Sequence, residues 1–259
     1  MSIRWAKMVH DLTDLPGIAS AGFDAVQPTV EHLMELRDEH FTLAKENLLT
    51  NNLIPEVCSS PLPPDARVTQ RGFNIYAWTE YLKRAVRRTA ELGCKKLVWN
   101  DGRARVLPME GDMSGIKEQV LQFLYMLCDI AGNYGITILV EPLGPRRTNF
   151  LNSMEEMKDF LPLVGKENLS SLISLRELSE IGIGLKDAGP YSHLISHVHL
   201  ENPMKQEGRR QAPRKDDGYD YRPFLRALHD CGYQGVITLP EEADETSLGY
   251  CRTIWESLG

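Results

Sequence analysis

The chain has 259 residues, of which 42% are hydrophobic and 25% are charged. This composition is close to the globular average, so the chain can bury a full core and shows no compositional sign of disorder. The net charge of −7 argues against nucleic acid as the main partner, because that binding depends on many Lys and Arg contacts to phosphates. The five cysteines are widely spaced and form no CxxC pair, which predicts neither a disulfide framework nor a thiolate zinc site.

The N-terminal stretch MSIRWAKMVHDL lacks the apolar core of a signal peptide. No run of the sequence approaches the roughly 18 apolar residues of a membrane span. We therefore expect a cytoplasmic protein with no membrane partner.

Short β-like runs alternate with longer amphipathic stretches from one end of the chain to the other. The eight strand candidates are residues 4–10, 24–28, 54–59, 95–101, 136–142, 169–175, 195–201 and 236–240. Such alternation is typical of a parallel sheet built from βα units, and a (β/α)8 barrel needs about 250 residues. The sequence therefore predicts an α/β protein with a single-domain (β/α)8 TIM barrel over residues 1–259.

The helical stretches differ in strength. YAWTEYLKRAVRRTAELG has apolar residues at helical spacing and should end at Gly93, and IKEQVLQFLYMLCDIAGNYG should end at Gly135. RELSEIGIGLKDAGPYS, after the sixth strand, has three glycines and a proline and predicts a poor helix. Two loops, 61–72 and 206–218, follow strands and should stand on the C-terminal face, where barrel active sites are built.

The fifth strand candidate ends in a carboxylate. In ITILVEPLGPRRTNF, Glu141 is in phase with Thr137 and Leu139 and out of phase with Ile138 and Val140. If the latter two pack on helices, Glu141 faces the barrel interior at the catalytic end. A catalytic carboxylate and a structural ion pair with an arginine both fit this position.

The seventh strand candidate, ISHVHLEN, places His197, His199 and Glu201 on one face and Val198 and Leu200 on the other. Imidazole binds many divalent metals and also serves as a structural hydrogen-bonding group. Both interpretations of His199 stay open on this pattern alone.

Basic residues gather in two loops. They are Arg103 and Arg105 after the fourth strand, and Lys205, Arg209, Arg210, Arg214 and Lys215 after the seventh. We expect most of them to be solvated, and one or two to clamp a substrate carboxylate, phosphate or hydroxyl with the planar guanidinium fork. The sequence has no GxGxxG, P-loop, GxSxG or HExxH motif, which removes the usual dinucleotide, nucleotide, hydrolase and zincin interpretations.

Several segments together resemble the xylose isomerase-like TIM barrels, the family of tagatose and psicose 3-epimerases, hydroxypyruvate isomerase and, more distantly, endonuclease IV. The resemblance covers nearly the whole chain. Its segments are GFDAVQ (22–27), YLKRAVRRTAELGCKKLVWNDGRARVLP (81–108), GITILVEPLGPRRTNFLNS (135–153), ISHVHLENP (195–203) and DDGYDYRPFLRALHDCGYQGVITLPEE (216–242).

The resemblance implies a divalent ion at the barrel mouth, held by a Glu, an Asp, a His and a second Glu. The ion polarises the carbonyl and hydroxyl groups of a sugar while the two glutamates move a proton. Glu141 matches the first glutamate, His199 matches the histidine, and Arg209 or Arg210 resembles a substrate-contacting arginine. Mn, Mg, Co or Zn would suit such a mixed site.

The chain departs from this pattern at the other two ligands. Ser174 stands where the family has its Asp, with Glu177 three residues later, and Pro240 stands where the second Glu is expected. A set of Glu141, His199 and Glu177, completed by a shifted Glu241, would rebuild the site. The depleted ligand set otherwise implies weak metal binding or none.

Two further acidic positions of the family carry Gln27 and Arg147 in this chain. Fewer carboxylates and one more guanidinium make the mouth more positive, which disfavours a dication and favours an anionic ligand.

We therefore expect a sugar isomerase or epimerase-like protein that acts on a small polyhydroxy carbonyl compound. Glu141 would be its acid/base, and Arg147, Arg209 and Arg210 would anchor an anionic sugar or sugar-like ligand. The alternative is a carbohydrate- or metabolite-binding barrel without catalysis. An abasic-site endonuclease would need more site histidines and a basic surface. Assembly with identical subunits stays open.

Overall fold

Eight parallel strands form a nearly closed barrel in the computed structural model, which describes residues 3–182, 189–204 and 210–259. The strands are β1 (Arg4–Met8), β2 (Ala25–Gln27), β3 (Val57–Ser59), β4 (Lys96–Trp99), β5 (Thr137–Val140), β6 (Leu169–Ser174), β7 (Ile195–His199) and β8 (Val236–Leu239). They are hydrogen-bonded in the order β2-β1-β8-β7-β6-β5-β4-β3. Two isolated parallel bridges, Ala25 to Ile54 and Thr29 to Ser59, connect the two outermost strands. The predicted (β/α)8 barrel is confirmed.

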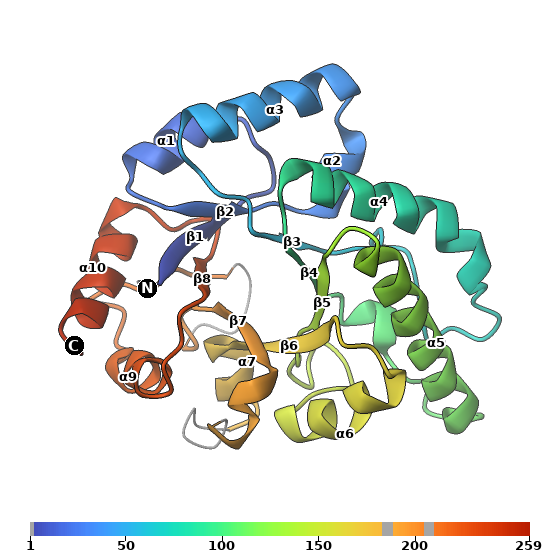
Figure 1. The fold of residues 1–259 in the computed structure, drawn as a ribbon. Helices are drawn as coiled ribbons and strands as arrows, with labels where there is room; N and C mark the ends of the chain where they lie inside the picture. The colour runs from blue at the N-terminus through green and yellow to red at the C-terminus, as the bar shows by residue number, and fades with distance from the viewer. Residues whose placement is uncertain (1–2, 183–188, 205–209) are drawn as a thin grey trace.

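Helices surround the barrel on its outside (Figure 1). They are α1 (Leu15–Ser20), α2 (Val30–Glu35), α3 (Asp38–Thr50), α4 (Thr79–Leu92), α5 (Met113–Gly132), α6 (Met154–Val164), α7 (Leu175–Glu180), α9 (Arg222–Asp230) and α10 (Glu245–Glu256), with 3-10 turns η1 (Ile75–Trp78), η2 (Arg103–Arg105) and η3 (Gly189–Leu194). None of the helices in these described ranges combines the length and the apolar character needed to cross a membrane.

The two faces of β5 show how the strands build the core. Ile138 and Val140 point outward and belong to the main apolar cluster that the helices cover. Leu139 points inward, where it packs in a separate buried cluster with residues of β3, β4 and β6. The alternation predicted for this strand therefore holds, and it directs the next inward position, Glu141, into the barrel at its C-terminal end.

Glycines end two of the helices in different ways. Gly93 follows α4 at φ +113°, a left-handed conformation that favours glycine, as the sequence predicted. The predicted end of α5 at Gly135 was wrong, because the helix ends at Gly132. The amides of Tyr134 and Gly135 bond to carbonyls three residues back rather than four, so the chain leaves the helix before Gly135 turns into β5.

Candidate active site

A buried carboxylate and a buried imidazole meet at the centre of the barrel mouth. Glu141 directly follows β5, His199 ends β7, and both side chains are fully buried. His199 Nδ1 donates a hydrogen bond to Glu141 Oε1 at 2.9 Å. Only β6 separates these two strands in the sheet, so their C-terminal ends lie close together. The structure thus brings together the two residues that the sequence singled out first.

Gln27, the last residue of β2, joins the two histidines of β7. Its amide nitrogen lies 3.1 Å from His199 Nε2, and its amide oxygen lies 3.0 Å from His197 Nε2. The Gln27 carbonyl oxygen can only accept, so it accepts from His197 Nε2. Thr238 of β8 places its hydroxyl 3.1 Å from His197 Nε2. A hydrogen-bonded network therefore crosses the barrel from β5 to β2 and β8.

The surrounding charges keep Glu141 ionised. Burial by itself raises the pKa of this carboxyl, but the charge and hydrogen bond of His199, with Arg210 and Arg147, outweigh it and lower the pKa to about 2. Burial lowers the pKa of His197 well below its usual value, and the charge of His199 adds to this, so the His197 imidazole is neutral. Within the described residues, Glu141 Oε2 has no hydrogen-bond partner.

Arg105 was expected among the solvated loop residues, but its side chain is fully buried next to the main chain of Glu141. Its Nη2 donates to the main-chain carbonyl of Glu141, and its guanidinium lies 5.4 Å from the Trp99 ring centroid. Burial lowers the pKa of Arg105 to about 9, although the charge of Glu141 opposes that change. This contact fixes the backbone where β5 ends. Nothing in the local sequence distinguished Arg105 from the solvated arginine two positions before it.

Glu177 and Arg147 form an ion pair beside this centre. Glu177 Oε2 accepts from the Gly144 amide at 2.6 Å, and its Oε1 accepts from Arg147 Nη1 at 3.2 Å. Arg147 Nη2 also donates to the carbonyl of Asn100 at 3.0 Å. Burial, followed by the charge of Glu141, raises the pKa of Glu177. Arg147 therefore neutralises a nearby carboxylate, and its predicted contact with a substrate stays a prediction.

Arg210 forms a second ion pair, with Glu201. The Glu201 side chain is buried, its Oε1 accepts from Arg210 Nη1, and its Oε2 lies 3.7 Å from Arg176. Glu201 continues the inward face of β7, as the alternation predicted. Arg209, the other candidate anchor in this loop, lies outside the described residues.

The two substituted ligand positions have structural roles. Ser174 caps α7, where its hydroxyl accepts from the Glu177 amide at 3.5 Å. Pro240 directly follows β8. The next residue, Glu241, has 55% of its side chain exposed and lies 3.1 Å from His10 Nε2. Glu241 thus faces the rim of the mouth and not the buried centre.

The donors at the centre do not fit a divalent ion in this arrangement. In the part of the chain that the structure describes, no group of three or more His, Cys, Asp or Glu side chains is placed to hold one. Glu141 and His199 bond to each other, and both oxygens of Glu177 have other partners. A divalent ion needs several donors that converge on one point. The metal set of Glu141, His199 and Glu177 stays a prediction.

A cavity of about 740 Å³ lies at the barrel mouth, and neither Glu141 nor His199 is among its lining residues. Gln27 forms part of its floor and is also the residue that bonds to His199. Hydroxyl and amide groups from Ser59, Ser60 and Asn100 line one side, and Arg210 lies in the wall. This polar lining suits a ligand with several hydroxyl groups.

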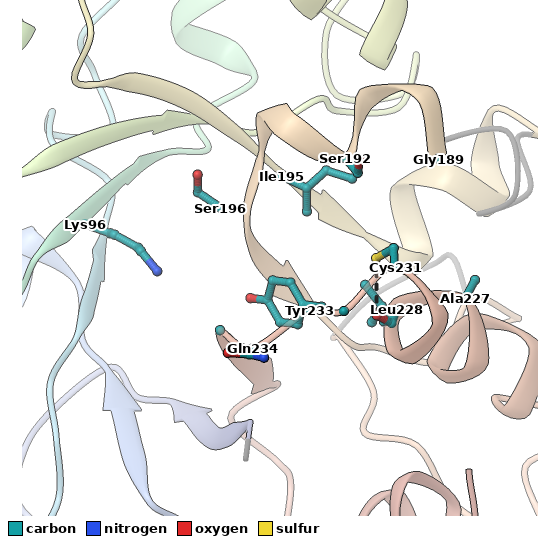
Figure 2. A pocket seen from close by; sticks show the side chains of 12 residues that line it. Lys96, Gly189, Ser192, Ile195, Ser196, Ala227, Leu228, Cys231, Tyr233 and Gln234 are labelled. Atoms are coloured by element: carbon teal, nitrogen blue, oxygen red, sulfur yellow. Dashed lines mark hydrogen bonds between the residues drawn. The ribbon is translucent and has the colours of Figure 1, made fainter. Parts of the chain in front are cut away.

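Another cavity, of about 420 Å³, lies at the opposite end of the barrel (Figure 2). Lys96 and Ile195, which line it, are the first residues of β4 and β7, and Tyr233 precedes β8. The Lys96 amine lies 3.1 Å from Glu56. In this fold the N-terminal end of the strands serves stability and the C-terminal end carries chemistry, so the mouth is the candidate active site.

A family model described as xylose isomerase-like TIM barrel matches residues 17–252. The chain therefore belongs to the xylose isomerase-like TIM barrel family, as the sequence predicted.

Several epimerases are similar to this chain. D-psicose 3-epimerase of Agrobacterium fabrum (strain C58 / ATCC 33970) is 22% identical over an alignment 259 residues long. This alignment covers 93% of this chain and 83% of that protein. The structure of a D-psicose 3-epimerase in the presence of D-fructose has a TM-score of 0.82 at 15% identity, covering 99% of this chain and 100% of the other. A 3-keto-D-glucoside 4-epimerase from E. coli has a TM-score of 0.80 at 16% identity, covering 97% and 100%. At these identities the solved structures establish a common fold.

Proposed function

We propose that this protein is a sugar isomerase or epimerase that acts on a small polyhydroxy carbonyl compound, with Glu141 as its acid/base. The observation that carries the proposal is the unpartnered Oε2 of the buried, ionised Glu141. The mouth cavity, which Gln27 of the same network lines, and the epimerases among the relatives support the same assignment.

An ionised carboxylate can remove a proton from the hydroxyl-bearing carbon beside a carbonyl group and return it to the former carbonyl carbon, while the hydroxyl proton moves to the former carbonyl oxygen. His199 holds Oε1 of Glu141, which leaves Oε2 as the oxygen that would take the proton. A single base on one face of the substrate suits this isomerisation. Epimerisation with bases on both faces needs a second free group, whereas Glu177 is paired with Arg147.

Replacing Glu141 with Gln tests this role. Incubation with ketoses such as D-fructose and D-psicose in D2O, followed by NMR, measures both turnover and incorporation of solvent deuterium. We expect the wild type to exchange deuterium and Glu141→Gln to lose about 100-fold or more of that rate, while thermal unfolding stays close to wild type. Glu256→Gln, at an exposed position of α10, is the matched control. Equal rates for Glu141→Gln and the control would remove Glu141 from the mechanism.

We further propose that a divalent ion binds weakly or not at all, because the centre lacks two of the implied ligands. Elemental analysis of the purified protein, and the same exchange assay with Mn²⁺ or a chelator, measure this directly. We expect substoichiometric metal. One tightly held ion per chain would refute the proposal and restore the set of Glu141, His199 and Glu177.

Arg147, Arg209 and Arg210 are the proposed anchors for an anionic ligand. Arg147→Glu should weaken binding of an anionic sugar and leave binding of a neutral sugar unchanged, which calorimetry can measure. Arg146→Glu is the matched control, because Arg146 is the adjacent arginine and is paired with Glu180 at 3.2 Å. Equal effects of the two substitutions on the anionic sugar would contradict an anchoring role.

A binding barrel without catalysis is the second candidate. Mutual pairing of the charged groups, Glu177 with Arg147 and Glu201 with Arg210, favours it, because paired groups are less available for chemistry. Saturable sugar binding by the wild type, with no deuterium exchange under any metal condition, would establish this alternative in place of the enzyme.

A further inference from the structure

A cavity outside the proposed active site lies between the loops that follow β3 and β4, at the start of α5. Its volume is about 960 Å³, and its lining includes Arg67, Arg71 and Arg103. These residues belong to the Pro-rich loop after the third strand and to the loop after the fourth, on the same face of the barrel as the mouth. None of the three arginines lines the mouth cavity or bonds to the Glu141 network.

The positive charge of this cavity is only partly balanced. Arg67 Nη1 donates to the main-chain carbonyls of Pro64 at 2.6 Å and Ala66 at 3.0 Å. Among the described residues, neither Arg67 nor Arg71 has a carboxylate within 4.0 Å, and Arg103 Nε lies 3.9 Å from Asp101. The chain has a net charge of −7, so carboxylates are plentiful. Two guanidinium groups in one cavity without a carboxylate partner among the described residues therefore need an explanation.

Two acidic residues also line the cavity, and they have different roles. Asp112 is the N-cap of α5, and its Oδ1 accepts from the Gly115 amide at 2.9 Å. Its charge therefore stabilises the helix that it begins. Glu110 is exposed and makes no ion pair within the described part of the chain. The Asp112 carboxylate thus balances the positive end of α5, so the positive charge of the cavity comes from the arginines.

Hydrogen bonds between the two loops and α5 fix the wall of the cavity. Thr69 Oγ1 donates to the carbonyl of Val106 at 2.6 Å, and the Thr69 amide donates to the carbonyl of Ala104 at 3.2 Å. Gln119 of α5 donates from Nε2 to the carbonyl of Gln70 at 3.0 Å. A wall that is already ordered lowers the entropy lost when a ligand binds.

We propose that this cavity binds the phosphate group of a small molecule through Arg67, Arg71 and Arg103. A guanidinium offers a planar fork of donors that matches phosphate oxygens, and three such side chains line this one cavity. The proposal is independent of the chemistry at Glu141.

Equilibrium binding of inorganic phosphate at low ionic strength and neutral pH tests it. We expect saturable binding to the wild type and an affinity about tenfold or more lower in the Arg71→Glu/Arg103→Glu double variant. Glu110→Gln should bind severalfold more tightly, since it removes an opposing charge. Arg226→Glu, an exposed site on α9 with the same charge change per residue, should bind like the wild type.

The assignment would be overturned by no saturable phosphate binding by the wild type, by unchanged affinity in the double variant, or by an equal loss in Arg226→Glu. Glu141→Gln separates this site from the proposed active site and should bind phosphate like the wild type. Loss of phosphate binding in that variant would place the ligand at the mouth and contradict the inference. Failure of the sugar chemistry at Glu141 would leave phosphate binding in place.

Discussion

The two halves of the barrel interior differ in chemistry. On the side of β3 to β6, the inward side chains Val57, Val98, Leu139 and Leu172 form a buried apolar cluster. On the side of β7, β8 and β2, inward positions carry His197, Thr238 and Gln27, which are equally buried but bonded to one another.

The two halves are stabilised in different ways. The apolar half gains stability from close packing, which depends little on pH. A cavity in this half lowers the free energy of unfolding. The polar half depends on the hydrogen bonds among its buried groups, since an unpaired polar group in the interior is costly. Glu141 lies where the two halves meet, two residues after Leu139 and on the same inward face of β5. Its hydrogen-bond partner, His199, belongs to the polar half. The apolar half therefore positions the Glu141 carboxylate within a hydrogen-bonded network.

The largest effect is expected in the apolar half. Leu139→Ala should lower the free energy of unfolding by about 2–5 kcal/mol, because it leaves a cavity among side chains that cannot close around it. Urea denaturation followed by circular dichroism measures the change. Leu163→Ala, at a position on α6 that is 67% exposed, is the matched control and should change stability by less than about 0.5 kcal/mol. Similar losses for the two variants would mean that the inward cluster is not a packing unit.

A smaller, pH-dependent effect is expected in the polar half. Burial keeps the pKa of His197 below its usual value in the folded protein, so the unfolded chain takes up a proton at a higher pH than the folded one. The stability contributed by neutral His197 is therefore present above the ordinary histidine pKa and is lost as the pH falls below it. The slope from this one group is at most about 1.4 kcal/mol per pH unit.

His197→Gln should flatten this dependence between about pH 7 and pH 5, because an amide can replace the donor to Gln27 without titrating. Thermal or urea unfolding across that range measures the difference from the wild type. His40→Gln, at an exposed position of α3, should keep the wild-type dependence. A variant at position 197 with an unchanged pH dependence would show that His197 is not held neutral by burial.

Local pattern was sufficient to find every strand of the barrel, with overestimates at the ends. The candidate at 95–101 contains β4, which the structure limits to Lys96–Trp99, and the candidate at 236–240 contains β8, which ends at Leu239. The extra residues, such as Asn100 and Pro240, lie where the chain leaves the sheet for the mouth loops. Alternation identifies the phase of a strand but not the residue at which pairing stops.

The sequence by itself determined the βα order, from the alternation of strand and helix patterns, and the family, from the resemblance of several segments. The inward direction of Glu141 and His199 follows from the period of two within each strand. The tertiary structure decided the partners: Gln27 reaches His199 across 172 positions of sequence, and Arg147 reaches Glu177 across 30. It also buried Arg105 behind the carboxylate. Partners are set by strand order and register in the closed barrel, and no local pattern contains that information.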